Sequence, residues 1–211
     1  AATPSTDLSL GTSSPFAGTS FDMLGGQYVA VANQGANSAV YKWNGSTLAT
    51  VTLGTATGSD GVDWVPFVVG GEQYLLWVSL SANSILYKWD MSNSRFNSVQ
   101  NDFAVSQGLG GDAFVINGTQ YVVVGGAGSV TNTYKFNTTT GKLEAAQSLS
   151  ITGRDFAGFV IGGVQYLSVA TGTNTRIYKW NATTSLFESA QTISTTSARG
   201  VENFSLNGEQ Y

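Results

Sequence analysis

Acidic residues recur at one kind of position in this chain, near the start of an apolar stretch that repeats along the sequence. Asp63 and Asp155 lie four residues before a phenylalanine of that stretch, and Asp112 and Glu202 lie two residues before one. Both offsets have the same parity, so in a β-strand the carboxylates would face the same side. Strands arranged around an axis would bring them together at one mouth of a channel, and oxygen ligands suit a hard cation. The sequence therefore predicts a calcium site formed by Asp63, Asp112, Asp155 and Glu202, with a solvated acidic rim or pairing to arginines as the alternative.

A pair of carboxylates is also the machinery of glycosidases. Catalysis needs one asymmetric site, however, and these acids recur once per unit, which argues against that use. The 211-residue chain contains no histidine and no cysteine. This composition excludes zinc sites built on His or Cys, and mechanisms that need a His base or a Cys nucleophile. We therefore expect that the protein is not an enzyme.

The elements that must position the acids are copies of one unit. Glycine-centred turns recur at Gly25-Gly26, Gly70-Gly71, Asn117-Gly118, Gly162-Gly163 and Asn207-Gly208. Each turn is followed within two residues by Gln-Tyr, which gives Tyr28, Tyr74, Tyr121, Tyr166 and Tyr211. Aromatic triplets follow the first four, at Tyr41-Lys42-Trp43, Tyr87-Lys88-Trp89, Tyr134-Lys135-Phe136 and Tyr178-Lys179-Trp180. A period of about 46 residues held in phase identifies a repeat protein.

Each unit has the pattern of four short strands. The Gly-Gly or Asn-Gly pair supplies positive φ for a tight hairpin turn. Continuous apolar runs such as residues 74–78 suit a strand buried on both faces, and the polar last strand suits an edge that faces water. Four strands in about 46 residues predict the blade of an all-β propeller. A β-sandwich would not repeat in sequence, and the coil of a β-solenoid is usually shorter.

The chain contains about four and a half of these repeats. We expect blades at residues 21–63, 64–111, 112–154 and 155–200, and a partial fifth at residues 201–211. Residues 1–20, with Leu8–Leu10 inside them, resemble the outer-strand ending of a repeat. The last eleven residues should form an inner hairpin, and no third strand follows them. Because such a hairpin leaves backbone groups unpaired, we expect self-association or marginal stability.

The aromatic triplets allow two interpretations. A lectin could stack sugars on one aromatic pair per blade. Alternatively, a Tyr and a Trp two residues apart share one face of a strand and would fill the core between blades. We favour packing, with the intervening lysines solvated or paired with acids.

Composition limits the partners. The net charge is −4 and no basic patch is present, so nucleic acid is not an expected partner. No apolar run approaches the ~20 residues of a membrane span, so membrane insertion is not expected. Glycosylation acceptor triplets begin in predicted turns at Asn44, Asn137 and Asn181, which favours a secreted glycoprotein.

The fourth unit carries the clearest resemblance to a known family. It reads Tyr-Leu-Ser-Val-Ala from Tyr166 and Ile-Tyr-Lys-Trp-Asn from Ile177, followed by Phe187, Gln191 and Ile193. These motifs resemble the EPTP, or epilepsy-associated, repeat, and the likeness extends over nearly the whole chain. The segments Val62-Asp63-Trp64 and Arg154-Asp155-Phe156 resemble that family's acidic-aromatic entry to the inner strand. Propellers of the family typically have seven blades.

The resemblance implies an extracellular propeller, secreted or at the cell surface, that binds a protein ectodomain or matrix component without catalysis. This is the function we expect. A carbohydrate-binding propeller with a glycan ligand is one alternative. The other is a self-assembling structural subunit, a homo-oligomer, suggested by the incomplete fifth blade and by the low content of charged residues, 10%.

Overall fold

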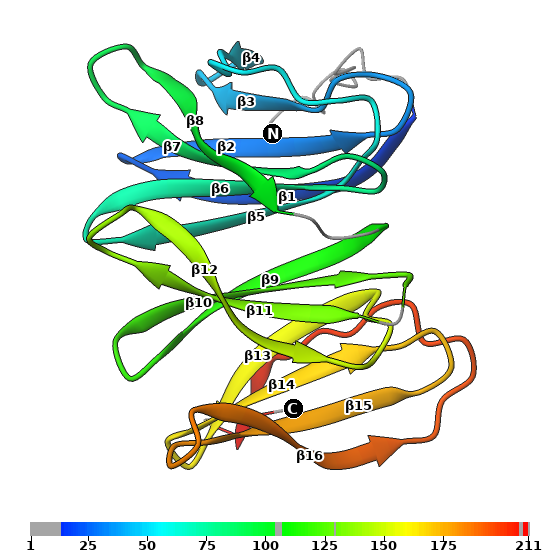
Figure 1. Cartoon of the computed structure of the whole chain (residues 1–211). Helices are drawn as coiled ribbons and strands as arrows, with labels where there is room; N and C mark the ends of the chain where they lie inside the picture. Colours follow the sequence, from blue (N-terminus) through cyan, green and yellow to red (C-terminus); the bar gives the residue numbers. More distant parts are fainter. Residues whose placement is uncertain (1–13, 104–106, 129, 207–208, 211) are drawn as a thin grey trace.

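The fold is an all-β propeller array built from four sheets of four antiparallel strands (Figure 1). The computed structural model describes residues 14–103, 107–128, 130–206 and 209–210. No helix occurs in these ranges, and so none that could span a membrane. The predicted fold class is confirmed.

The strands follow the chain in order. The first blade contains β1 (Pro15–Met23), β2 (Gly26–Asn33), β3 (Ala39–Trp43) and β4 (Leu48–Val51). The second contains β5 (Gly61–Val69), β6 (Glu72–Ser79), β7 (Ser84–Asp90) and β8 (Arg95–Phe103). The third contains β9 (Gly108–Ile116), β10 (Thr119–Gly126), β11 (Thr131–Asn137) and β12 (Lys142–Leu149). The fourth contains β13 (Asp155–Ile161), β14 (Val164–Ala170), β15 (Thr175–Asn181) and β16 (Leu186–Ile193). A short pair follows, β17 (Ser205–Leu206) and β18 (Glu209–Gln210).

The first strands of neighbouring blades lie side by side, in the order β1, β5, β9 and β13. The tight turn that leads from each to the second strand has the positive φ that the sequence predicts. In the second blade Gly70 and Gly71 have φ of 59° and 81°, and in the third Asn117 and Gly118 have 49° and 77°. In the first blade the positive values fall on Leu24 and Gly25, so this turn lies one residue earlier than expected.

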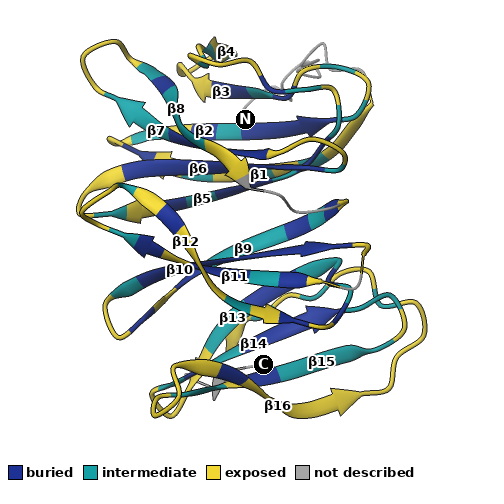
Figure 2. Ribbon diagram, in the orientation of Figure 1, coloured by how far each residue is buried: buried dark blue, intermediate teal, exposed yellow. Residues whose placement is uncertain are grey.

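Burial falls from the inner strands to the outer strand, as Figure 2 shows for the fourth blade. Every residue of β6 except Glu72 is buried, whereas in β16 only Phe187 is buried. The core lies between blades rather than within one of them. Each of three apolar clusters joins two consecutive blades.

The two ends of the array differ from the expectation. Strand β1 begins at Pro15 rather than near residue 21, because Ala17–Met23 pair with Gly26–Ala32. Residues 15–20 therefore belong to an inner strand and not to an outer-strand segment. Leu8–Leu10 lies outside the described residues. At the other end Val201 lies outside any strand, and β17 begins only at Ser205.

Candidate functional site

The four predicted acids line one cavity of about 500 Å³ beside the inner strands. Asp63 lies on β5, Asp112 on β9 and Asp155 on β13, and Glu202 lies before β17. The four residues therefore come together at one place in the structure. What these side chains contact differs from the prediction.

Each aspartate holds the backbone of the next blade. The Asp63 Oδ2 accepts a hydrogen bond from the Gly111 N–H at 3.0 Å, and the Asp112 Oδ2 accepts one from the Gly158 N–H at 2.7 Å. The Asp155 Oδ2 accepts one from the Val201 N–H at 2.7 Å. We call these three contacts the carboxylate clamps. An inner strand has no strand on its channel side, so its N–H groups need another acceptor when buried, and the clamps supply it.

The second oxygen of two of these carboxylates accepts a hydrogen bond from the following residue. The Oδ1 of Asp63 accepts from the Trp64 N–H at 2.8 Å, and the Oδ1 of Asp112 accepts from the Ala113 N–H at 2.7 Å. Both carboxylates are thereby fixed in orientation.

This arrangement does not assemble the predicted calcium ring. Among the described residues, no three His, Cys, Asp or Glu side chains lie close enough together to hold a metal ion. The strand register gives the reason. Asp63 and Asp155 lie opposite Val78 and Ala170, which are equivalent positions in their blades. Asp112 lies opposite Val123 and is therefore two residues further along its strand than the other two aspartates. The carboxylates point at the next blade instead of at a common centre. The four residues therefore do not fit the predicted cation.

Burial changes the ionisation of two aspartates. It raises the pKa of Asp63 to about 7 and that of Asp112 to about 6, although backbone hydrogen bonds lower both values. The nearby Asp155 carboxylate raises both further by repulsion. A buried carboxylate that loses its proton is thus unfavourable even where N–H donors face it.

These shifts predict that stability falls as the pH rises. Below about pH 4 both aspartates are protonated in the folded and the unfolded chain. Between about pH 4 and 7 the unfolded chain loses these protons first, so the free energy of unfolding should decrease, and it should level off above pH 7. Urea unfolding at a series of pH values measures this slope. Asp63→Asn should flatten it, and a stability that rises over this range would contradict the assignment.

A second contact between blades was missed by the sequence analysis. The Gln147 Nε2 donates to the Phe187 carbonyl at 2.8 Å, and the Phe187 N–H donates to the Gln147 Oε1 at 2.8 Å. Gln100 makes the same pair with Leu143 of the third blade, at 3.0 and 2.8 Å. We call these contacts the glutamine clamps. The signal was present, because a glutamine recurs four residues after Phe96, Leu143 and Phe187.

Replacing Gln147 by alanine should lower the free energy of unfolding by ~1–2 kcal/mol. The change leaves the N–H and the carbonyl of Phe187 without their partner in a half-buried interface. Gln191→Ala is the matched control, since Gln191 occupies the equivalent position opposite Ile177 but is exposed. Chemical denaturation compares the two. Equal losses would show that the clamp contributes nothing specific.

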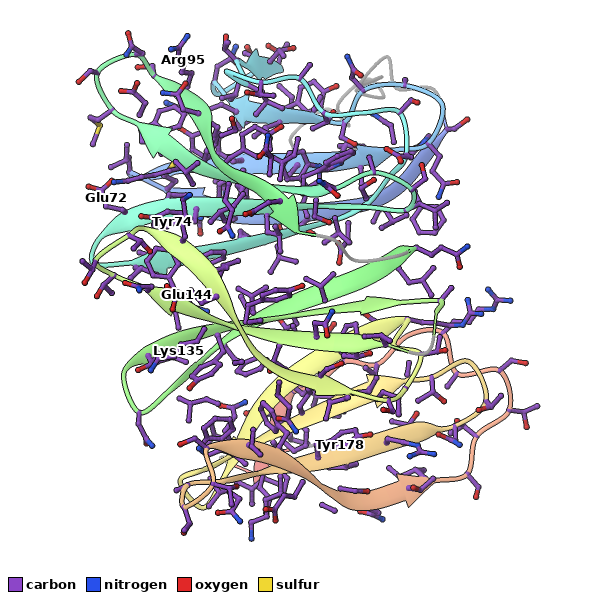
Figure 3. The ribbon with its side chains drawn as sticks, viewed as in Figure 1. Glu72, Tyr74, Arg95, Lys135, Glu144 and Tyr178 are labelled. Atoms are coloured by element: carbon purple, nitrogen blue, oxygen red, sulfur yellow. The ribbon has the colours of Figure 1, made fainter. Side chains whose placement is uncertain are left out.

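The aromatic triplets fill the spaces between blades, as the packing interpretation predicts. Tyr87, Tyr134 and Tyr178 are buried. The ring of Trp89 lies edge-on to Tyr28 of the preceding blade, with centroids 6.3 Å apart. Phe136 packs on Tyr74, which is labelled in Figure 3, with centroids 4.9 Å apart, and Trp180 packs on Tyr121 at 5.3 Å. Trp43 is 38% exposed and is the most exposed of these rings.

The lysine of the triplets lies on the opposite side of the strand from the aromatic pair. In the second blade Lys88 forms an ion pair with Glu72 at 3.6 Å, and its ammonium lies 5.9 Å from the centroid of the Tyr74 ring. In the third blade Lys135 lies opposite Glu144 in the strand register, and Figure 3 shows both at the same side of the array. These lysines therefore belong to a solvated polar edge.

The predicted glycosylation residues form the turn after each third strand. The Oδ1 of Asn137 accepts from the N–H groups of Thr139 and Thr140, and its Nδ2 donates to Glu144. Asn44 and Asn181 make the corresponding turn contacts. In the second blade Asp90 takes this place and accepts from Ser92 and Asn93, so the turn requires the oxygen and not the amide nitrogen. Glycosylation at Asn44, Asn137 and Asn181 stays a prediction.

Part of the chain matches a known protein family. Residues 56–90 match the EPTP domain. The match covers the loop before β5 and strands β5–β7, so it falls within the second blade. The predicted resemblance is confirmed for this segment, and the glycine-centred turns and the tyrosines that follow them recur in the other blades. No curated protein sequence matches the chain.

The fold also occurs in a solved structure of different sequence. The periplasmic gluconolactonase PpgL of Pseudomonas aeruginosa superimposes with a TM-score of 0.59 at 21% identity. The alignment covers 84% of this chain and 54% of the gluconolactonase, so the chain spans about half the length of that protein. At this identity the likeness shows the propeller fold and no more.

Proposed function

We propose that the chain is a non-catalytic binding module of the extracellular space that recognises a protein partner. The observation that carries the proposal is the use of the central carboxylates. Asp63 and Asp112 each accept two backbone N–H groups, and Asp155 accepts one from the segment after the fourth blade. Carboxylates whose oxygens accept backbone N–H groups of the next inner strand join consecutive blades, and this structural use of the central acids supports a binding module.

The EPTP match supports the same proposal. EPTP domains occur in extracellular proteins, and the domain lies here within one blade of a repeated array. A propeller presents loops and hairpin turns at the blade edges, where binding residues are commonly found. The partner expected from the resemblance is a protein ectodomain or a matrix component.

Carbohydrate binding receives less support from the structure. The lectin interpretation needs aromatic faces that are open to a sugar. The rings of Trp89, Phe136 and Trp180 instead pack on tyrosines of the preceding blade. Trp43 is more open, at 38% exposure, but it is a single site rather than one per blade.

One experiment separates these functions. The immobilised 211-residue chain is exposed to a panel of soluble ectodomains and matrix proteins, to a glycan array, and to chromogenic glycoside and lactone substrates. We expect saturable binding of a protein, no turnover, and no dependence of binding on enzymatic removal of its glycans. Turnover that Asp112→Asn abolishes in a folded variant would overturn the proposal, as would binding to glycans alone.

A further inference from the structure

A cavity of about 510 Å³ opens between the third and fourth blades, at the edge of the array that holds the hairpin turns. The turns β9–β10 and β13–β14 lie at the left of Figure 1. Val115 and Ile116 of β9 form one wall, and the other wall comes from the fourth blade and includes Val160, Gln165 and Trp180. The cavity therefore lies at an interface whose two blades are both within the described chain. Its volume is in the range of small-ligand sites.

A smaller form of the same cavity lies between the second and third blades. It has a volume of about 360 Å³. Thr119 and Thr138 line it at the places that Val164 and Ala182 take in the larger cavity. Val160, which also lines the larger cavity, is 51% exposed. The cavity is thus a regular feature of the interface between blades, and the form at the fourth blade is larger and richer in aliphatic side chains.

The amide of Gln165 has unused hydrogen-bonding capacity in the larger cavity. Gln73 and Gln120, the equivalent residues, each donate from Nε2 to two backbone carbonyls, at 3.1 and 2.8 Å. Gln165 donates only to the Tyr166 carbonyl, at 2.9 Å, although it is 6% exposed. Within the described chain one N–H and the Oε1 of this amide have no partner. A buried amide in this state favours a ligand that offers both an acceptor and a donor.

A lysine without an ion pair lines the same cavity. In the second blade Lys88 forms an ion pair with Glu72 at 3.6 Å. Val164 takes the place of Glu72 in the fourth blade, and the equivalent lysine there, Lys179, lines the cavity. Lys179 forms no ion pair with any residue that the structure describes.

The surroundings of Lys179 leave its ammonium available to an anion. Glu188 lies opposite it in the strand register and also lines the cavity. The Oε1 of Glu188 instead accepts a hydrogen bond from the Asn181 Nδ2 at 2.7 Å. In the third blade Lys135 lines the smaller cavity although a fourth blade follows, so a following blade does not displace a lysine from this position.

We propose that this cavity binds the C-terminal residue of a protein partner, an apolar residue with a free carboxylate. Its side chain lies against Val160 and Trp180, and its backbone amide pairs with Gln165, as a backbone pairs with the amide of Gln147 in a glutamine clamp. Its carboxylate accepts a charge-assisted hydrogen bond from Lys179. An apolar residue that also bears a negative charge occurs in a polypeptide only at the C-terminus. The inference rests on the proposed function, because it names the part of the partner that is recognised.

The probe is the peptide acetyl-glycyl-phenylalanine with a free carboxylate, and the same peptide with an amidated C-terminus is the comparison. Each is titrated into the 211-residue chain while the indole N–H signals are followed by NMR. The chain has five tryptophans, and Trp180→Phe identifies the signal of Trp180. We expect the free acid to shift this signal saturably. The amidated peptide should bind about threefold more weakly, as expected for loss of a solvent-accessible ion pair.

Variants of the protein test each contact. Lys179→Met keeps the apolar stem and should abolish the difference between the two peptides. Gln165→Met should weaken the binding of both peptides about fivefold, because it removes the amide. Lys135→Met is the matched control at the smaller cavity and should leave both affinities unchanged. Circular dichroism and melting temperature show whether each variant is folded.

Three results overturn the inference: no saturable shift of the Trp180 signal, equal binding of the two peptides, and a preference for the free acid that survives Lys179→Met. A preference lost in Lys135→Met instead would assign the carboxylate to the smaller cavity and would also overturn it. A protein partner that still binds the Lys179→Met and Gln165→Met variants would retain the proposed function and reject the inference. Peptide binding by a chain that binds no ectodomain or matrix protein would retain the cavity and reject the proposed function.

Discussion

Replacing Trp77 by alanine should lower the free energy of unfolding by about 3–5 kcal/mol, the range for removing a buried aromatic side chain. Trp77 is 1% exposed and lies in the cluster that joins the first and second blades. Its indole N–H donates to the Ser38 Oγ at 2.9 Å, so the side chain also bonds one blade to the other. The alanine leaves a cavity between two sheets that are held apart by their other contacts.

The environment of Trp77 explains why this blade differs from the others. The equivalent residues are Val31, Val124 and Val169. A larger ring fits here because the neighbouring chain has glycines. A Cβ added to Gly61 would lie 2.5 Å from the Trp77 Nε1, and one added to Gly58 would lie 3.3 Å from its ring. Local packing against these glycines therefore explains why a tryptophan stands at this position.

Urea denaturation followed by far-ultraviolet circular dichroism measures the loss. Trp43→Ala is the control, since Trp43 is 38% exposed and should cost less than ~1 kcal/mol. A loss below ~1 kcal/mol for Trp77→Ala would show that the two blades close over the cavity without cost.

Most of the fold could be predicted from the sequence because its motifs repeat. Glycine turns in phase with tyrosines fix where each hairpin lies, and a triplet with two aromatics on one face indicates an interface on that face. Such features are local, so the chain itself shows them. The start of β1 could not be predicted because it has no such local feature. Residues 17–20 read Ala-Gly-Thr-Ser, which has no apolar pattern, and they form a strand because β2 pairs with them.

The role of the acids could not be read in this way. Strand parity showed that Asp63 and Asp112 face the same side, but not that each lies beside a particular N–H of the next blade. That contact depends on how far one inner strand is displaced along its neighbour. The displacement is set by packing between blades, which involves residues about 46 positions apart. Convergence toward a channel was therefore predictable, while the choice between a cation and the backbone was not.

The carboxylate clamps also require that the residue donating the N–H group can approach the preceding blade closely. Replacing such a residue is therefore the second change for which we expect a large loss of stability. Gly111→Ala should lower the free energy of unfolding by about 2–4 kcal/mol, through overpacking and a strained clamp. An added Cβ would lie 2.8 Å from the Val123 carbonyl oxygen and 2.9 Å from the Val65 Cγ2 of the second blade. Relief of these contacts moves the inner strand away from Asp63, whose Oδ2 accepts the Gly111 N–H.

Gly18→Ala is a matched control, because the two glycines occupy the same place in their blades. Gly18 lies opposite Val31, and Gly111 lies opposite Val124. A Cβ on Gly18 would find its nearest neighbour, the Ala30 carbonyl oxygen, at 3.9 Å, which is an ordinary contact. Since alanine also restricts the unfolded chain, Gly18→Ala should be neutral or stabilising by up to ~1 kcal/mol. Equal losses in the two variants would mean that glycine is needed here for the backbone alone. A loss confined to Gly111→Ala would mean that the close approach of the second and third blades, and the carboxylate clamp within it, sets the requirement.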